Sequence, residues 1–187
     1  CTGTSLRIRH DRQLIRRGET SARIAAKAHT RFGSVTLEAV IFENKRELFV
    51  NGNKVTKAAD FVGNMNCVFF SPGELRLIQD GPDERRRFLN LSISQTSREY
   101  CTALARYQRI LDQRNNLLKG RDVSLVLETL PVWDEQLSVY AARIVRHRRR
   151  YLSELSPLAH DAHAYLTDGA EDLRLDMGGS YPEDETE

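Results

Sequence analysis

The period with which apolar side chains recur changes near residue 80, and this change limits the folds that the chain can adopt. Between residues 22 and 41 apolar residues occupy every second position, a pattern typical of strands with one buried face. From residue 88 onward they recur every three or four positions, as on amphipathic helices. We therefore expect an α+β fold in which an antiparallel β meander precedes an all-helical part.

The segment that joins the two patterns contains two chain breakers. Residues 67–70 are apolar and β-favouring throughout, which predicts a central strand buried on both faces. Residues 71–73, Ser-Pro-Gly, end that run, because proline donates no backbone hydrogen bond and glycine tolerates positive φ. A second breaker at 81–82 is followed by two acidic residues, 83–84, which favour the positive end of a new helix.

The first half predicts a sheet with one solvated face. Residues 22–28 and 35–41 both alternate, and the short connection at 32–34 indicates that they pair antiparallel. A third strand at 47–50 leads into Asn51-Gly52, a hairpin signal because both central residues of such a turn need positive φ. The return begins at 54–55, and a meander of this kind is more often structural than catalytic.

The second half predicts helices with clear limits. The first helix ends near Thr96, and the Ser97 hydroxyl is expected to cap the second, which Gly120 terminates. Residues 123–130 are expected to form a short helix or turn, after which Pro131 stands in the first turn of a long helix. Pro157 is expected to end, kink or restart that helix.

The remaining elements are minor. Residues 58–63 are expected to form a short helical or irregular bridge, and residues 173–177 alternate again as a candidate strand. The acidic residues 182–187 are expected to form a solvated end. The helices together suggest an antiparallel pair or small bundle that projects from the β part as an arm.

Composition excludes several classes of protein. The formal net charge is only +2, so net charge alone does not predict a nucleic-acid partner. The three cysteines, Cys1, Cys67 and Cys101, form no C-x-x-C pair and indicate a reducing compartment, hence a cytoplasmic protein. No apolar run approaches the roughly 20 residues that a membrane helix needs, and no signal peptide is visible. Because Cys1 is not a natural start, we expect a fragment or a trimmed chain.

The motifs of nucleotide hydrolysis are absent. No G-x-x-x-x-G-K-[ST] loop occurs, and no apolar strand ends in Asp-Glu, so the sequence lacks a phosphate cradle and a magnesium ligand. We expect neither ATP hydrolysis nor a bound cofactor for this chain alone, and no residue is assigned a catalytic role. His160 and His163, with Asp161 between them, have the spacing of two metal ligands but no third, so no metal site is predicted.

One set of arginines has the spacing of a phosphate-binding stripe. Arg143, Arg146 and Arg150 follow an i, i+3, i+7 pattern, which places them on one helical face together with His147. Such a stripe neutralises phosphates without reading sequence. Glu154, four residues after Arg150, could quench part of that charge.

A second set is consecutive. Arg85, Arg86 and Arg87 cover most of the helix circumference, so they cannot all face one ligand. At least one is expected to pair with a nearby acid, Asp83, Glu84 or Glu74. A lobe-joining ion-pair cluster and direct DNA contact both remain open.

Several blocks of the sequence resemble the RecF family of bacterial recombinational repair ATPases, which belong to the SMC/ABC-type superfamily. The pattern Val-Phe-Ser-Pro, acidic-Leu, Leu, Gly-x-Pro, Arg-Arg-Arg-Phe-Leu is the most specific of them. The blocks that carry the resemblance are residues 2–7, 68–89, 94–95, 107, 113–119 and 133–137.

The resemblance implies an organisation in lobes. Residues 1–80 would be the β-rich part of ATPase lobe I, residues 81–166 the helical arm or lobe II, and residues 167–187 a return strand and acidic tail. The phosphate loop would lie upstream and the signature motif downstream. Arg7 would follow the phosphate-loop helix, and Ser71 would stand at the lobe junction where related ATPases carry a metal-contacting glutamine. Ser71-Pro72 is equally explained as a strand terminator.

The resemblance also implies a function for the intact protein, with ATP and Mg²⁺ as cofactors. RecF-like proteins bind DNA at single-strand gaps and gap junctions in an ATP-dependent manner, form a homodimer around two ATP molecules and hydrolyse ATP slowly. They help RecA loading together with RecO and RecR. Two other hypotheses stay open: a stand-alone helical protein-interaction module without DNA binding, and an enzyme with a cryptic hydrolytic site. Salt titration separates the first two, because phosphate binding weakens steeply with salt.

Overall fold

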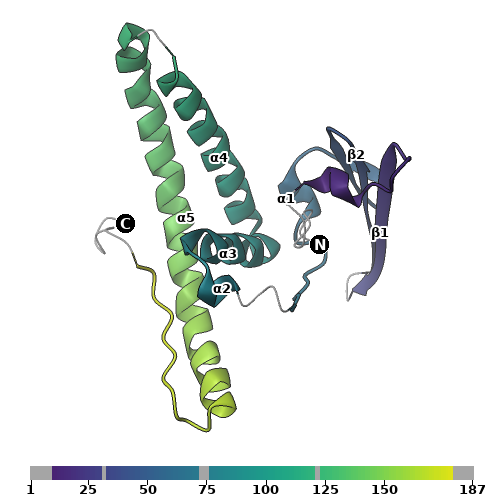
Figure 1. The fold of residues 1–187 in the computed structure, drawn as a ribbon, viewed down its shortest axis with the longest axis vertical. Coiled ribbons are helices and arrows are strands. Elements are labelled where there is room, and N and C mark those ends of the chain that lie inside the picture. The colour runs from purple at the N-terminus through teal and green to yellow at the C-terminus, as the bar shows by residue number, and fades with distance from the viewer. Residues whose placement is uncertain (1–9, 31–32, 72–75, 121–122, 179–187) are drawn as a thin grey trace. The chain divides into compact units, whose positions relative to one another are not determined.

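A four-stranded antiparallel sheet occupies the first part of the chain in the computed structural model, which describes residues 10–30, 33–71, 76–120 and 123–178 (Figure 1). The strands are β1 (Ser21–Thr30), β2 (Gly33–Phe42), β3 (Arg46–Val50) and β4 (Asn53–Val55). They lie in the order β1-β2-β3-β4, and each pairs antiparallel with the next. The predicted meander and the α+β class are therefore confirmed.

The core of the sheet lies on β2, which carries its buried side chains Leu37 and Ile41. In the observed register Ala26 stands opposite Leu37, and Leu37 opposite Val50, so the apolar alternations of three strands share one face. Leu37 is only 3% exposed, whereas Ile24 on the edge strand β1 is 52% exposed. A short 3₁₀ helix, η1 (Asp11–Leu14), lies against β2.

The hairpin between β3 and β4 forms at the predicted turn. Asn51 and Gly52 have φ of +50° and +80°, as the primed turns of hairpins require. The Asn51 backbone N–H donates to the Thr36 carbonyl and its Oδ1 accepts from the Thr36 N–H, both at 2.8 Å. These two bonds continue the β2–β3 pairing for one residue beyond the end of β3.

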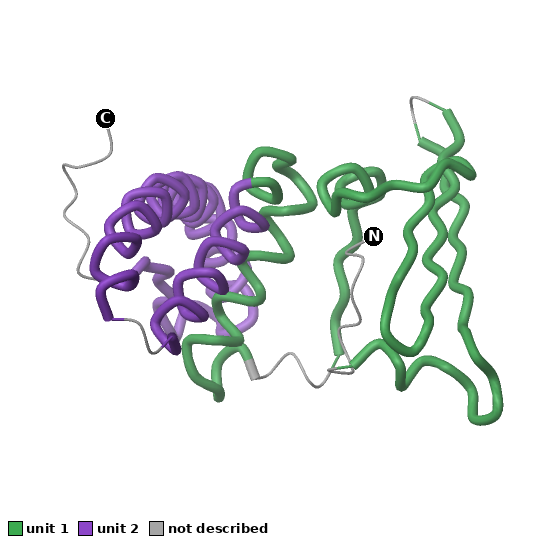
Figure 2. Tube along the Cα trace, turned by 90° about the horizontal axis from the view of Figure 1, so that it is seen from above, with its two compact units in different colours: residues 1–102 green, residues 103–187 purple. Residues whose placement is uncertain are grey.

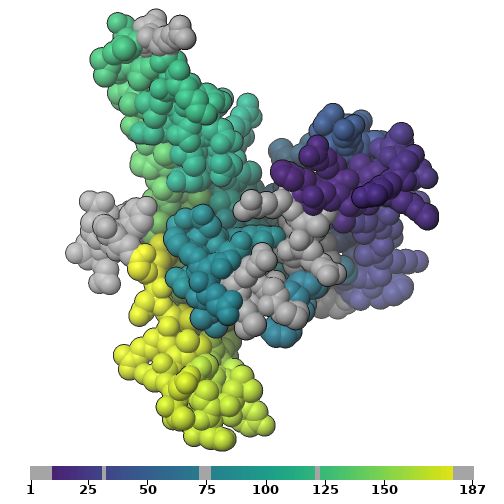
Figure 3. All heavy atoms as spheres, viewed as in Figure 1, coloured from purple at the N-terminus to yellow at the C-terminus, as the bar shows by residue number. Residues whose placement is uncertain are grey.

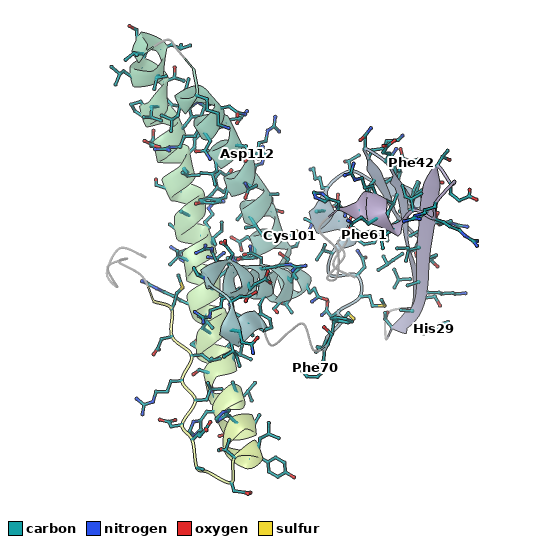
Figure 4. All side chains as sticks on the ribbon, viewed as in Figure 1. His29, Phe42, Phe61, Phe70, Cys101 and Asp112 are labelled. Atoms are coloured by element: carbon teal, nitrogen blue, oxygen red, sulfur yellow. The ribbon has the colours of Figure 1, made fainter. Side chains whose placement is uncertain are left out.

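The structure differs from the sequence-based prediction at residues 67–70. After the short helix α1 (Ala58–Phe61), which fills the predicted bridge, this apolar run forms no strand. Val68 is 99% and Phe70 85% exposed, and Figure 4 shows the Phe70 ring projecting from the chain. A strand needs a neighbour that completes its backbone hydrogen bonds, and no described strand lies beside this run.

Four helices follow, α2 (Arg76–Gln79), α3 (Pro82–Thr96), α4 (Arg98–Leu118) and α5 (Val123–Leu166). Two of them, α3 and α4, begin and end close to the predicted residues. Ser97 caps α4 as expected, since its Oγ accepts the Tyr100 backbone N–H at 3.1 Å. Tyr100 is fully buried and donates its hydroxyl proton to Asn90 Oδ1 at 2.7 Å, which ties α4 to α3.

The predicted break before Pro131 does not occur, and the helix neither ends nor restarts at Pro157, because α5 continues through both prolines. A kink at Pro157 remains a prediction. Each proline removes one internal hydrogen bond, which leaves the carbonyl four residues earlier without its helical partner. Both prolines are exposed, so their rings face water. The opposite face holds buried side chains, among them Ile144. That packing keeps the helix continuous.

The chain divides into two compact units, residues 1–102 and residues 103–187 (Figure 2). Within the second unit α4 and α5 run antiparallel (Figure 1), and Arg114 of α4 pairs with Asp134 of α5. The hydrogen bond to this carboxylate raises the pKa of Arg114 above its ordinary value. The predicted limits at residues 80 and 166 remain predictions.

The segment after α5 returns along that helix in an extended form. Leu173, Leu175 and Met177 are half-buried and alternate with exposed residues, but no strand forms over residues 173–177. The predicted alternation of half-buried and exposed residues is present. The backbone hydrogen bonds of a strand are not, because the described residues supply no neighbouring strand to pair with this segment. Figure 3 shows the atoms of this segment against the end of α5. In the part of the chain that the structure describes, no helix is both long and apolar enough to cross a membrane.

Candidate nucleic-acid interface

The three arginines predicted to form a stripe share the outer face of α5. Arg143, Arg146 and Arg150 are all exposed, while Ile144 and Val145 between them are only 4% and 8% exposed. The i, i+3, i+7 spacing therefore gives the face that the sequence indicated. Such a row presents guanidinium groups to solvent along about two turns of the helix.

Local contacts orient two of these side chains. The Arg143 guanidinium lies over the Tyr140 ring, 5.5 Å from its centroid, an arrangement worth about 0.5–1 kcal/mol at an exposed site. Arg150 Nε donates to Glu154 Oε1 at 3.0 Å, and the two side chains are 82% and 65% exposed. The expected quenching by Glu154 is therefore present. It is weak, because both partners are solvated and the acid follows the base in the chain.

The same two turns of α5 contain two arginines that sequence reasoning did not select. Arg148 and Arg149 are both half-buried. Arg148 lies on the same side of the helix as the buried Ile144, and Arg149 lies on its flank. Both have interactions within the protein, as do Arg146 and His147. The basic residues of this part of α5 therefore form two sets, the exposed stripe Arg143, Arg146 and Arg150 and the half-buried pair Arg148 and Arg149. The sequence could have separated the two sets by the angle that each residue makes with Ile144 around the helix axis.

The consecutive arginines of α3 point to three different partners. Arg85 donates to the Leu77 and Ile78 carbonyls at 3.2 and 3.3 Å, where it caps the last turn of α2. Arg86 pairs with Asp83, and Arg87 approaches Glu84 at 3.5 Å. The expected pairing with nearby acids occurs, which favours the ion-pair interpretation. Contact of these three residues with DNA remains a prediction.

A glutamine side chain, that of Gln95, makes two hydrogen bonds with the backbone at the start of the exposed run at 67–70. Gln95 lies at the end of α3, and its Oε1 accepts the Cys67 backbone N–H at 2.8 Å. Its Nε2 donates to the Cys67 carbonyl at 3.3 Å, so the side chain meets the backbone as a neighbouring strand would. Gln95 belongs to a block that resembles RecF, the one signal by which the sequence marked it.

Two residues were predicted to lie near a nucleotide, and the structure describes one of them. Ser71 is half-buried at the end of the extended run, and Arg7 lies outside the described residues. No group of three histidine, cysteine or acidic side chains in the described ranges could hold a metal ion. His160 and His163 instead face Asp172 and Glu171, at 3.1 and 3.4 Å. The roles of Ser71 and Arg7 near a nucleotide remain predictions.

Comparison with known proteins shows which of them are similar to this chain in sequence and in fold. The chain is 36% identical over 177 residues to the DNA replication and repair protein RecF of Alkaliphilus oremlandii, a match that covers 92% of this chain and 47% of the relative. The protein of the same name from Staphylococcus epidermidis is 33% identical over 174 residues, covering 92% and 47%. The chain spans about half the length of the curated relatives that it matches. No family model matches it.

Solved structures give the same result for the fold. The structure of the recombination mediator protein RecF-ATP in the RecFOR pathway superposes with a TM-score of 0.79 at 28% identity, over 89% of this chain and 45% of that one. The RecF-ATPrS structure gives a TM-score of 0.77 at the same identity. The sheet and the helices together therefore match proteins of the DNA replication and repair class. Within that class, the chain belongs to the RecF family.

Proposed function

We propose that this chain forms the central part of a RecF-like protein that binds DNA at single-strand gaps and gap junctions in an ATP-dependent way. In this proposal the α5 stripe contacts the phosphate backbone. The observation that carries it is the exposed row Arg143, Arg146 and Arg150, whose inner neighbours are buried. Guanidinium groups bind phosphate oxygens through paired hydrogen bonds, and they do so without regard to base sequence.

ATP and Mg²⁺ belong to the same proposal but to the longer protein. Ser71 and Arg7 would be this chain's contributions near the nucleotide, the first through its hydroxyl and the second through its charge. The exposed run at 67–70 would complete a strand with backbone outside this chain. Its support is the 99% exposure of Val68 beside a Cys67 backbone that already has a strand-like partner in Gln95.

The proposed protein assembles with others in the bacterial cytoplasm. It would form an ATP-dependent homodimer and act with RecR and RecO to help RecA loading. These partners follow from the family and from the RecFOR pathway named for the similar structures. The arginines of α3 could add to the DNA surface only if DNA displaces their present partners, the acids at positions 83 and 84 and the α2 carbonyls.

The test is a salt titration of DNA binding. Fluorescence anisotropy with a gapped duplex, between about 50 and 200 mM salt, gives the slope of log K against log salt, about 0.9 per neutralised phosphate. Replacing Arg146 and Arg150 with Ala in the full-length protein with ATP should weaken binding and flatten the slope by about 1.8. Arg174→Gln, which removes an exposed arginine paired with Asp172, is the matched control and should leave the slope unchanged. An equal slope for the double variant and the parent would remove α5 from the DNA surface.

A second candidate function is the docking of a protein partner, and one observation favours it. Leu125, Val132 and Val139 are 52%, 52% and 47% exposed, and steps of seven residues place them along one line of α5. Apolar side chains in such a row suit a partner helix better than a phosphate backbone. Binding that depends on this row would change little with salt, which separates it from the DNA proposal.

A further inference from the structure

The outer face of α4 carries a second row of hydrogen-bond donors. Arg106, Arg109, Gln113 and Asn116 are all exposed and follow steps of three and four residues. The opposite side of the same helix carries Tyr100, which is fully buried, and the half-buried Leu104 and Leu111. At 100° per residue the four donors fall within roughly a quarter of the circumference. They therefore form one narrow stripe.

The two arginines of this stripe lack partners within the described part of the chain. The other arginines of α4 are paired: Arg98 with Asp60, and Arg114 with Asp134. Neither Arg106 nor Arg109 makes a hydrogen bond or an ion pair among residues 10–30, 33–71, 76–120 and 123–178. The acid nearest in sequence, Asp112, lies on the flank of the stripe and accepts a hydrogen bond from Gln108 at 3.1 Å (Figure 4).

The chemistry of the stripe fits a phosphate backbone. Arginine binds phosphate with two parallel N–H bonds, and the amides of glutamine and asparagine donate to phosphate oxygens. From Arg106 to Asn116 the helix rises about 15 Å, which corresponds to roughly four nucleotides of one strand at about 3.4 Å each. A protein interface would be expected to add apolar or aromatic side chains, and the stripe has none.

We propose that the α4 stripe, Arg106, Arg109, Gln113 and Asn116, is a second contact surface for the sugar-phosphate backbone of nucleic acid. This inference rests on the proposed function and extends the DNA-binding surface from α5 to a second helix, α4. The stripe would position the nucleic acid without base specificity, because none of its contacts requires a base edge. An acidic protein partner is the competing occupant.

The experiment compares two double variants of the full-length protein on the same DNA. Arg106→Gln with Arg109→Gln removes the α4 charges, and Arg146→Ala with Arg150→Ala removes two α5 charges. The α4 variant should flatten the slope of log K against log salt by about 1.8, so its loss of affinity between about 50 and 200 mM salt is about twelvefold smaller. The weakening should be equal on two duplexes of unrelated sequence. Arg106→Lys with Arg109→Lys should restore most of the slope, because each lysine still neutralises a phosphate.

The outcomes separate the two proposals. An unchanged slope in the α4 variant beside a flattened slope in the α5 variant overturns the α4 inference and leaves the proposed function standing. Unchanged slopes in both variants overturn both. Circular dichroism spectra and thermal midpoints that match the parent show that the exposed substitutions leave the fold intact. A flattened slope with failed rescue by lysine would also count against phosphate contact.

Discussion

Removal of one acidic side chain should tighten DNA binding if the α5 stripe faces phosphates. Glu154 is the side chain in question, since its Oε1 accepts the Arg150 Nε–H at 3.0 Å. Glu154→Gln keeps the shape and removes the charge. The Arg150 guanidinium then no longer shares its charge with a carboxylate, and one anion that repels phosphate is lost.

The size of the effect follows from the geometry of the pair. Both side chains are largely exposed, at 82% and 65%, and i, i+4 pairs at such sites are worth about 0.3–0.5 kcal/mol. An energy of that size corresponds to a change in affinity of about twofold. Because Arg150 already counts as one phosphate contact in the parent, the slope of log K against log salt should change by much less than about 0.9 on duplex DNA. The stability of α5 should fall by no more than the energy of the lost pair.

Anisotropy titrations at several salt concentrations measure both quantities, and Glu171→Gln is a suitable control. Glu171 is also an exposed acid of the second unit, but its partner is His163 rather than an arginine of the stripe. A general effect of net charge would appear in both variants, whereas the proposed contact predicts tighter binding for Glu154→Gln alone. Equal affinities of the two variants and the parent would refute the placement of Arg150 at the phosphate backbone.

Two further outcomes test the packing around α4. Tyr100→Phe should lower the free energy of unfolding by about 1–2 kcal/mol, because Asn90 Oδ1 loses the hydroxyl that donates to it at 2.7 Å. Urea denaturation measures this change, and an unfolding midpoint equal to that of the parent would contradict it. Exposed Cys67 should react with iodoacetamide at about pH 8 well before buried Cys101, because burial raises the pKa of the Cys101 thiol and keeps it protonated as pH rises. Mass spectrometry of the adducts with time gives the order, and urea should abolish the difference.

Local signals predicted the sheet well because each of them fixes a backbone geometry. Asn51-Gly52 demands positive φ, and the chain adopts it, so the neighbouring register follows from the turn. The run at 67–70 has the composition of a buried strand, but burial depends on a partner that composition does not identify. The described chain offers Cys67 only the Gln95 side chain, and the phenylalanine at 70 stays in solvent.

The helix limits show the same division between local and tertiary causes. Ser97 and Gly120 act on their own backbone neighbours, and both helix ends appear where these residues predict them. Pro131 and Pro157 also act locally, yet α5 passes through both. A proline inside a helix costs about 3 kcal/mol. Packing along the buried face of a 44-residue helix outweighs that cost.

Arginines that are adjacent in sequence do not share one face of a helix, whereas arginines spaced by helical turns do. Consecutive residues on a helix point about 100° apart, and the three arginines of α3 accordingly reach an acid each or a helix end. Arg106 and Arg109 drew no attention because they belong to no dense basic run such as residues 85–87 or 146–150. Their common face could nevertheless be predicted from the apolar stripe of α4, since Tyr100, Leu104 and Leu111 define the inward side. A sequence search for phosphate surfaces should therefore first orient each helix by its apolar residues, and only then count the charges left on the opposite side.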